Sequence, residues 1–225
     1  GGFEDGFGGF GGGPRVQYSQ GDFDDLLGGM FGGSSPFGSR RPAKGRDVTA
    51  RAALDFTSAV QGDTLKLTVG GRTMTVKVPA GVHDGQKIKL AGKGDPSPTG
   101  GEPGDLILTV QVRPHPVFTM DGLNLRVDVP VTFAEATLGA TIEVPTLGGS
   151  PVRLKVAPGT PSGRVLRVKG RGVAGKKGTG DLLATIQVAV PSHLTKDQVA
   201  HLERFVEAGP TESPRAELLA KAKAA

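Results

Sequence analysis

The 225-residue sequence has no cysteine and no tryptophan, and it has only one tyrosine. The absence of cysteine excludes disulfides, thiolate nucleophiles and every cysteine-ligated zinc site, and it fits the reducing, cytoplasmic location that we expect. No apolar run reaches the roughly 20 residues that a membrane-spanning helix needs. The N-terminus lacks the basic and apolar segments of a signal peptide. We therefore predict no membrane partner.

Residues typical of catalytic and metal sites are also scarce. The four histidines are His83, His115, His193 and His201. None lies three or four residues from another, and the chain has no Gly-x-Ser-x-Gly nucleophile motif. The sequence therefore predicts no metal site, no cofactor and no catalytic residue, and we expect a protein that is not an enzyme.

One glycine-rich segment, Gly170–Gly175, matches the Gly-x-Gly-x-x-Gly pattern of nucleotide-binding loops. A phosphate-binding loop needs Ser or Thr after its lysine and a helix behind it. Here Lys177 follows Lys176, and a strand is predicted next. We interpret this segment as a turn between strands.

Glycine and proline are abundant, with 37 and 17 residues, which argues against a helical bundle. Residues 1–39 hold 14 of the glycines and six of the ten phenylalanines, a composition typical of a flexible segment. This segment has a net charge of −4, so the rest of the chain carries +9. Within it, Phe23, Leu27 and Phe31 have the spacing of one face of a short helix that forms on docking.

After Val48 the sequence has short alternating runs that are broken by glycine and proline, and these runs repeat. Residues 54–67, 78–94 and 104–110 align in order with residues 131–144, 156–172 and 180–186. Phe56 thereby falls on Phe133, and Gly70-Gly71 reads as a tight hairpin turn. The sequence predicts an all-β fold of two tandem, similar β-sandwich domains, each with a short helix.

A helical segment follows the repeat. Thr195 and Gln198 form a capping box for a helix that ends near Gly209, and a second short helix is predicted after Pro214. One face of the first helix carries Val199, Leu202 and Val206. Because helices this short are unstable alone, we expect Leu202 and Val206 to contact either a second chain or the second β domain.

Six basic residues cluster around one predicted hairpin and loop. They are Arg164, Arg167, Lys169, Arg171, Lys176 and Lys177. Such a cluster is able to contact phosphates, but no aromatic residues lie among them. We therefore favour a solvated strand face here, and DNA remains the alternative partner.

Together these segments resemble the C-terminal substrate-binding part of DnaJ-type co-chaperones, the J-domain proteins. The resemblance rests on the Gly/Phe-rich segment, VPAG…GKG at 78–94, GDL at 104–106 and 180–182, and HPVF at 115–118 before Asp121-Gly122. Zinc-bearing members insert four Cys-x-x-Cys-x-Gly-x-Gly repeats where Gly70-Gly71 joins two strands here. The chain therefore resembles the zinc-free class B, which includes the curved-DNA-binding protein. It contains no His-Pro-Asp tripeptide, the mark of the J domain.

The resemblance implies that the first β domain binds unfolded or aggregation-prone polypeptides in an apolar groove beside an edge strand. It also implies presentation of these clients to a DnaK-type chaperone, and a homodimer joined through the helical segment by Val199, Leu202 and Val206. The family's groove positions fall on Ala50, Ala52, Leu67, Val69 and Leu108. We expect Leu67, Val69 and Leu108 to be partly exposed, although the pattern alone also fits plain core packing.

The expected organisation has four parts. Residues 1–45 form a flexible Gly/Phe-rich region, 46–120 the client-binding β domain, 121–193 the second β domain, and 194–225 the helical dimerisation segment. The chain begins with glycine rather than methionine, and we expect it to be part of a longer protein. A protein that binds or compacts DNA through its basic β domains is the alternative function.

Overall fold

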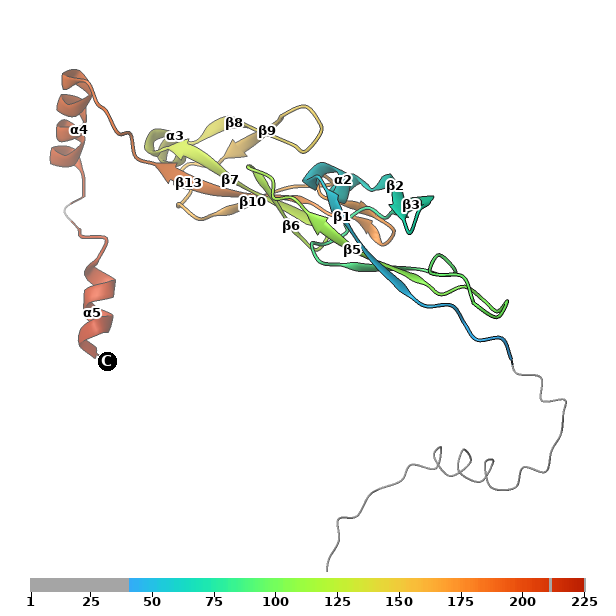
Figure 1. Cartoon of the computed structure of the whole chain (residues 1–225). Helices are drawn as coiled ribbons and strands as arrows, with labels where there is room; N and C mark the ends of the chain where they lie inside the picture. The colour runs from blue at the N-terminus through green and yellow to red at the C-terminus, as the bar shows by residue number, and fades with distance from the viewer. Residues whose placement is uncertain (1–40, 211, 225) are drawn as a thin grey trace, which may run out of the picture.

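The computed structural model describes residues 41–210 and 212–224, so residues 1–40 of the predicted Gly/Phe-rich region 1–45 lie outside the described residues. Two groups of strands follow each other along the molecule, and two helices lie at its C-terminal end (Figure 1). The predicted all-β fold with short helices is confirmed. We call β1 to β5 the first β unit and β6 to β13 the second β unit.

The first β unit contains one three-stranded sheet and one separate hairpin. Its elements are β1 (Val48–Leu54), α2 (Phe56–Gln61), β2 (Asp63–Val69), β3 (Arg72–Val78), β4 (Lys87–Leu90) and β5 (Leu106–Val112). In the sheet, β5 lies between β1, which is parallel to it, and β4, which is antiparallel. The hairpin β2–β3 turns at Gly70 and Gly71, whose φ values of 59° and 76° fit the predicted tight turn.

The second β unit repeats this topology and adds to it. Its elements are β6 (Phe118–Asp121), β7 (Asn124–Thr132), α3 (Phe133–Leu138), β8 (Ala140–Val144), β9 (Val152–Val156), β10 (Val165–Val168), β11 (Ala174–Gly175), β12 (Gly178–Thr179) and β13 (Leu182–Ala189). Here β13 lies parallel to β7 and antiparallel to β10, as β5 does to β1 and β4. Strand β6 and the small β11–β12 hairpin have no counterpart in the first unit. The glycine-rich Gly170–Gly175 segment was predicted to be a turn between strands; it connects β10 to β11, and its last two residues form β11.

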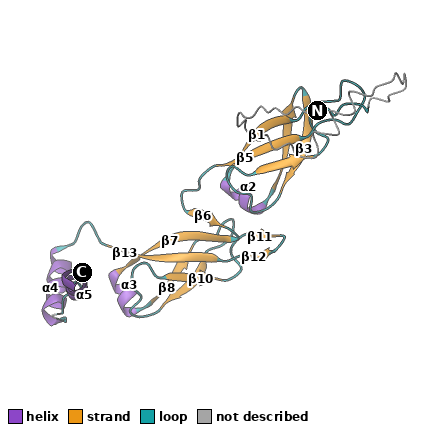
Figure 2. Ribbon diagram, turned by 90° about the horizontal axis from the view of Figure 1, so that it is seen from below, coloured by secondary structure: helices purple, strands orange, loops and turns teal. Residues whose placement is uncertain are grey.

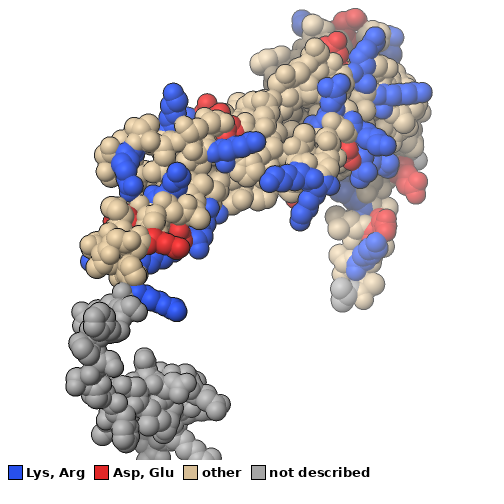
Figure 3. All heavy atoms as spheres, turned by 90° about the vertical axis from the view of Figure 1, so that its right-hand side faces the viewer, with Lys and Arg blue, Asp and Glu red and all other residues tan. Residues whose placement is uncertain are grey.

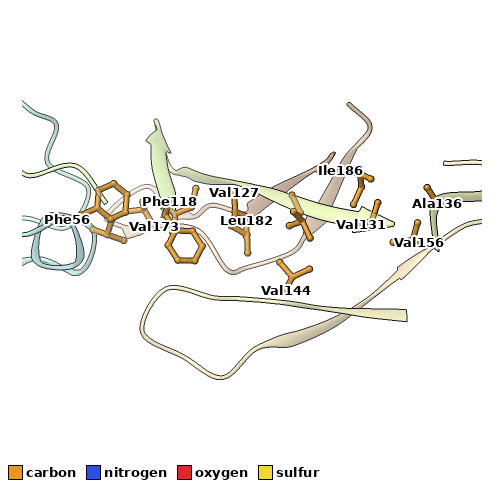
Figure 4. Packing of buried hydrophobic residues seen from close by; sticks show 14 residues of the cluster. Phe56, Phe118, Val127, Val131, Ala136, Val144, Val156, Val173, Leu182 and Ile186 are labelled. Atoms are coloured by element: carbon orange, nitrogen blue, oxygen red, sulfur yellow. The ribbon is translucent and has the colours of Figure 1, made fainter. Parts of the chain in front are cut away.

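The two units share a hydrophobic core at their junction. Phe56 and Val60 of α2 belong to the same cluster as Val173 and Leu182 of the second unit (Figure 4). His115 lies between the rings of Phe56 and Phe118, with centroid distances of 5.4 and 5.2 Å. Its Nδ1 accepts the backbone N–H groups of residues 117 and 118. The HPVF motif is therefore the joint between the units.

The C-terminal helices are α4 (Lys196–Ala208) and α5 (Ala216–Ala224). The predicted capping box of Thr195 and Gln198 is present at the start of α4. Figure 2 shows α4 beyond the end of the second unit that carries α3. Phe205 of α4 meets Phe133 of α3 edge to face, with ring centroids 5.6 Å apart. Within the described part of the chain, no helix is long and apolar enough to cross a membrane.

Candidate functional site

The predicted site residues of the first unit lie on three strands, β1, β2 and β5. Ala50 of β1 and Leu67 of β2 are half-buried and pack against the same cluster of Ala52, Val76 and Leu108. Val69 lies two residues beyond Leu67 and is also half-buried. We call Ala50, Leu67 and Val69 the apolar strip. Their partial exposure matches the expectation for Leu67 and Val69.

The prediction that Leu108 is partly exposed was wrong. We expected its side chain to reach solvent, but Leu108 is 0% exposed because β5 is the central strand of its sheet, covered by the β2–β3 hairpin. Ala52 is also buried, at 7% exposure. Both residues support the strip from beneath. Val144 of the second unit, which aligns with Leu67 in the sequence repeat, is covered, at 0% exposure.

The strip is bordered by two strands that pair on one side only. In the described residues, β1 pairs with β5 alone and β2 pairs with β3 alone. An unpaired strand edge presents a row of backbone N–H and C=O groups to an incoming peptide. Arg51 on β1 and Lys66 on β2 are exposed and alternate with the strip residues, so they lie on the outer faces of their strands. The arrangement combines backbone partners with apolar contact area.

Hydrogen bonds to Asp105 fix the loop that follows β4, next to the strip. The Gly92 N–H donates to Asp105 Oδ1 at 3.0 Å, and Lys44 and Lys89 place their Nζ atoms 3.1 and 3.2 Å from Oδ2. The Gly92 bond, followed by the Lys44 bond, lowers the pKa of Asp105 to about 2. The same pairing raises the pKa of Lys44. Asp105 therefore stays ionised and keeps this loop in place.

Two further residues beside the strip were missed by the sequence analysis. Met74 and Leu90 are half-buried and pack on the cluster beneath it. Both alternate correctly along β3 and β4, so periodicity was the signal that marked them as inward-facing. The third residue we missed is Phe205 on α4, whose contact with Phe133 no local pattern indicates.

The predicted dimerisation residues are exposed within a single chain. Val199, Leu202 and Val206 are 39%, 48% and 71% exposed. With Leu194 they line a hollow of about 420 Å³ on α4. We expected Leu202 and Val206 to contact either a second chain or the second β unit. Phe205, rather than Leu202 or Val206, contacts the second β unit, through Phe133. The α4 face around Leu202 is therefore exposed to solvent.

The basic cluster lies on the second unit, around β10 and the β11–β12 hairpin. All six of its residues are exposed. One of them, Arg167, pairs with Asp181 at 3.4 Å, and the other five form no ion pair within the described residues. Figure 3 shows Lys and Arg side chains outnumbering Asp and Glu on the face that it displays.

Residues 48–191 match the model of the DnaJ C terminal domain family. The chain belongs to the DnaJ family. The match begins at the first residue of β1 and ends just after β13, so it covers both β units.

Among curated DnaJ relatives, the chain is 53% identical over 145 residues to "Chaperone protein DnaJ 2" of Cutibacterium acnes, covering 64% of this chain and 38% of that protein. It is 36% identical to "Chaperone protein DnaJ 2" of Corynebacterium efficiens, over 88% of this chain and 68% of that protein. It is 38% identical to "Curved DNA-binding protein" of Serratia proteamaculans, over 86% and 68%. The chain spans about two fifths of the length of several DnaJ relatives, including two from Streptomyces.

Proposed function

We propose that this chain is the client-binding part of a co-chaperone, which binds unfolded or aggregation-prone polypeptide segments along the apolar strip. The main support for client binding is that Ala50, Leu67 and Val69 are half-buried beside two strand edges that are unpaired within the described residues. The relatives that are named chaperones support this role.

The proposed binding mode adds a client strand to an open edge. Backbone hydrogen bonds give an affinity that depends little on client sequence, while alternate side chains of the client rest on the strip. The small side chain of Ala50 leaves room for a leucine or phenylalanine of the client. Val144, which aligns with Leu67 in the sequence repeat, is fully buried, so we assign client binding to the first unit.

The test is suppression of aggregation by a Leu67→Asp variant. A carboxylate on the strip would have to lose water against apolar client atoms, so binding of a denatured client is expected to weaken. Lys77→Asp on β3 is the matched control, because Lys77 is exposed on the outer side of the same hairpin. If both variants suppress aggregation as well as the unmodified chain, the strip does not bind clients.

We extend the proposal to partners. Two chains pair through the open α4 face of Val199, Leu202 and Val206, and the resulting two-armed clamp binds one client more tightly than one strip does. A DnaK-type chaperone receives the client. We assign the chain no catalytic role.

We keep the proposed organisation of the chain as 1–45, 46–120, 121–193 and 194–225. The proposed boundary between the two β domains, after residue 120, falls within β6 (Phe118–Asp121), a strand of the second β unit.

DNA binding is the second candidate function. It is favoured by the five exposed basic residues around β10 and β11 that have no ion-pair partner within the described residues, and by the relative named for binding curved DNA. Phosphate contacts release counterions, so binding to DNA is expected to fall steeply between 50 and 200 mM salt. Nanomolar binding to duplex DNA at the higher salt, with no binding to denatured protein, would favour this function over client binding.

A further inference from the structure

The β2–β3 hairpin makes few hydrogen bonds to the rest of the first unit. Its backbone hydrogen bonds between strands all lie within its own two-stranded sheet, and Leu65, Leu67 and Met74 attach it to the other sheet by apolar packing. Among the hydrogen bonds of the described residues, one joins the hairpin to the rest of its unit. In that bond Arg72 Nη2 donates to the carbonyl oxygen of Gly94 at 2.7 Å.

The acceptor in this bond is held rigidly. Gly94 donates its own N–H to the Gly104 carbonyl at 2.8 Å. A Cβ atom at this glycine would lie 2.6 Å from the Gly104 carbonyl carbon and 2.7 Å from the Arg46 oxygen, so the backbone is closely packed on two sides. Gly92, two residues earlier, is bound to Asp105. Arg72 therefore connects the hairpin tip to a fixed point.

The position of Arg72 connects this bond to the apolar strip. Arg72 pairs directly with Val69 across the hairpin, and Leu67 pairs with Met74. A bond from Arg72 to Gly94 thus holds the end of β2 that carries Leu67 and Val69. Because no backbone ladder joins β2 to β1, this bond and the apolar packing together set the separation of the two strands.

The second unit offers an internal comparison. Its β8–β9 hairpin has five residue pairs rather than seven, and its turn is closed on itself by a hydrogen bond from Thr146 Oγ1 to the Ser150 carbonyl. Within the described residues, no side-chain hydrogen bond joins this hairpin to the loop around Gly172, the counterpart of Gly94. The side-chain hydrogen bond between hairpin and loop is thus present in the first unit, whose apolar strip is partly exposed.

We propose that Arg72 is a positioning residue for client binding, which sets the distance between β1 and β2 and thereby the preference for large apolar client side chains. This inference rests on the proposed function of the strip. Arg72 acts through the placement of Leu67 and Val69 and need not touch the client.

The experiment compares two unfolded peptides, one with leucine at its apolar positions and one with alanine at the same positions. Affinities are measured by fluorescence anisotropy with the 225-residue chain. Arg72→Ala is expected to weaken binding of the leucine peptide by about tenfold, the effect of one charge-assisted hydrogen bond. It should also reduce the preference for leucine over alanine. Arg72→Lys, which keeps one donor and the charge, should restore part of that preference.

Lys77→Ala is the matched control, because it removes a positive charge from an exposed position on the same strand. A merely structural role would lower the affinities for both peptides by one common factor, leaving the preference unchanged, and that result would overturn the proposal. Equal binding by the Arg72 variants and the unmodified chain would overturn it too. If Arg72→Ala does not fold, Arg72→Gln takes its place with the same two readouts. If the unmodified chain binds neither peptide, the proposed function itself fails.

Discussion

Asp105 and Asp181 occupy equivalent positions in the two β units and make the same hydrogen bond. Asp105 accepts the Gly92 N–H at 3.0 Å, and Asp181 accepts the Gly170 N–H at 2.9 Å. Each carboxylate also pairs with a basic residue of the strand that runs antiparallel to the one that follows it, Lys89 of β4 for Asp105 and Arg167 of β10 for Asp181. The repeated GDL sequence therefore marks, in both units, an aspartate that holds the loop before it in place.

The first prediction concerns pH. The pKa of Asp105 is about 2 in the folded chain, below its ordinary value of 3.8, so the unfolded chain binds more protons between these values. The stability that this carboxylate contributes is present above about pH 4 and is lost as the pH falls through 2. Asp105→Asn should lower the melting temperature at pH 7, and the difference from the unmodified chain should narrow below pH 3.

Thermal unfolding at pH 7 and at pH 2.5 measures this effect. Asp95→Asn is the control, since the Asp95 carboxylate is exposed and makes no ion pair within the described residues. A gap for Asp105→Asn that stays constant over the whole pH range would contradict the prediction.

The second prediction distinguishes Leu67, a residue of the apolar strip, from Leu108, a core residue beneath it. Leu108→Ala removes a fully buried side chain and should cost about 2–5 kcal/mol of unfolding free energy. Leu67→Ala removes a half-buried side chain, and it should cost clearly less while weakening client binding. Urea denaturation and aggregation suppression, measured on both variants, test this. Equal losses of stability would place Leu67 in the core and remove it from the site.

The third prediction concerns assembly. A chain that ends at Ser192 lacks α4 and should sediment as a monomer at micromolar concentration, whereas the 225-residue chain should be a dimer. Leu202→Asp should act in the same direction by placing a charge in the apolar α4 face. Leu218→Asp on α5 is the control, because Leu218 is also exposed but lies outside that face. A dimeric truncated chain would mean that the interface lies elsewhere.

The fourth prediction concerns the DnaK-type partner. The sequence has no His-Pro-Asp tripeptide, so this chain should not accelerate ATP hydrolysis by such a partner, even where it binds a client. A single-turnover ATPase assay with and without denatured client measures this. Stimulation equal to that of a complete co-chaperone would locate the activating contact within these 225 residues.

Local sequence patterns predicted most of the fold. The alternating runs predicted after Val48 are strands in the structure, as Leu65, Leu67 and Val69 of β2 show, because alternation along a strand is a local property. The Gly70-Gly71 turn and the Thr195 cap were predictable for the same reason. The internal repeat then predicted the similarity of the two units, which no single segment shows.

The errors concern contacts between distant segments. Leu108 alternates as Leu67 does, but only the order of strands shows that β5 is central and covered. Phe56 and Phe133 align in the repeat, yet Phe56 is 7% exposed and Phe133 is 51% exposed. The difference arises because the core shared with the second unit covers Phe56, whereas Phe133 points to the outside of α3, where Phe205 of α4 contacts it. The sequence repeat contains no information about these neighbours.

The core that Phe56 and Val60 share with Val173 makes the joint part of the folded interior. Val173 is fully buried, and a Cβ added at Gly81 of the first unit would lie 3.0 Å from its Cγ1 atom. Separating the chain between residues 113 and 117 would therefore leave Phe56 and Val60 facing water on one piece and Val173 on the other. The two β units are consequently expected to melt in one cooperative transition and to resist a protease at the HPVF motif.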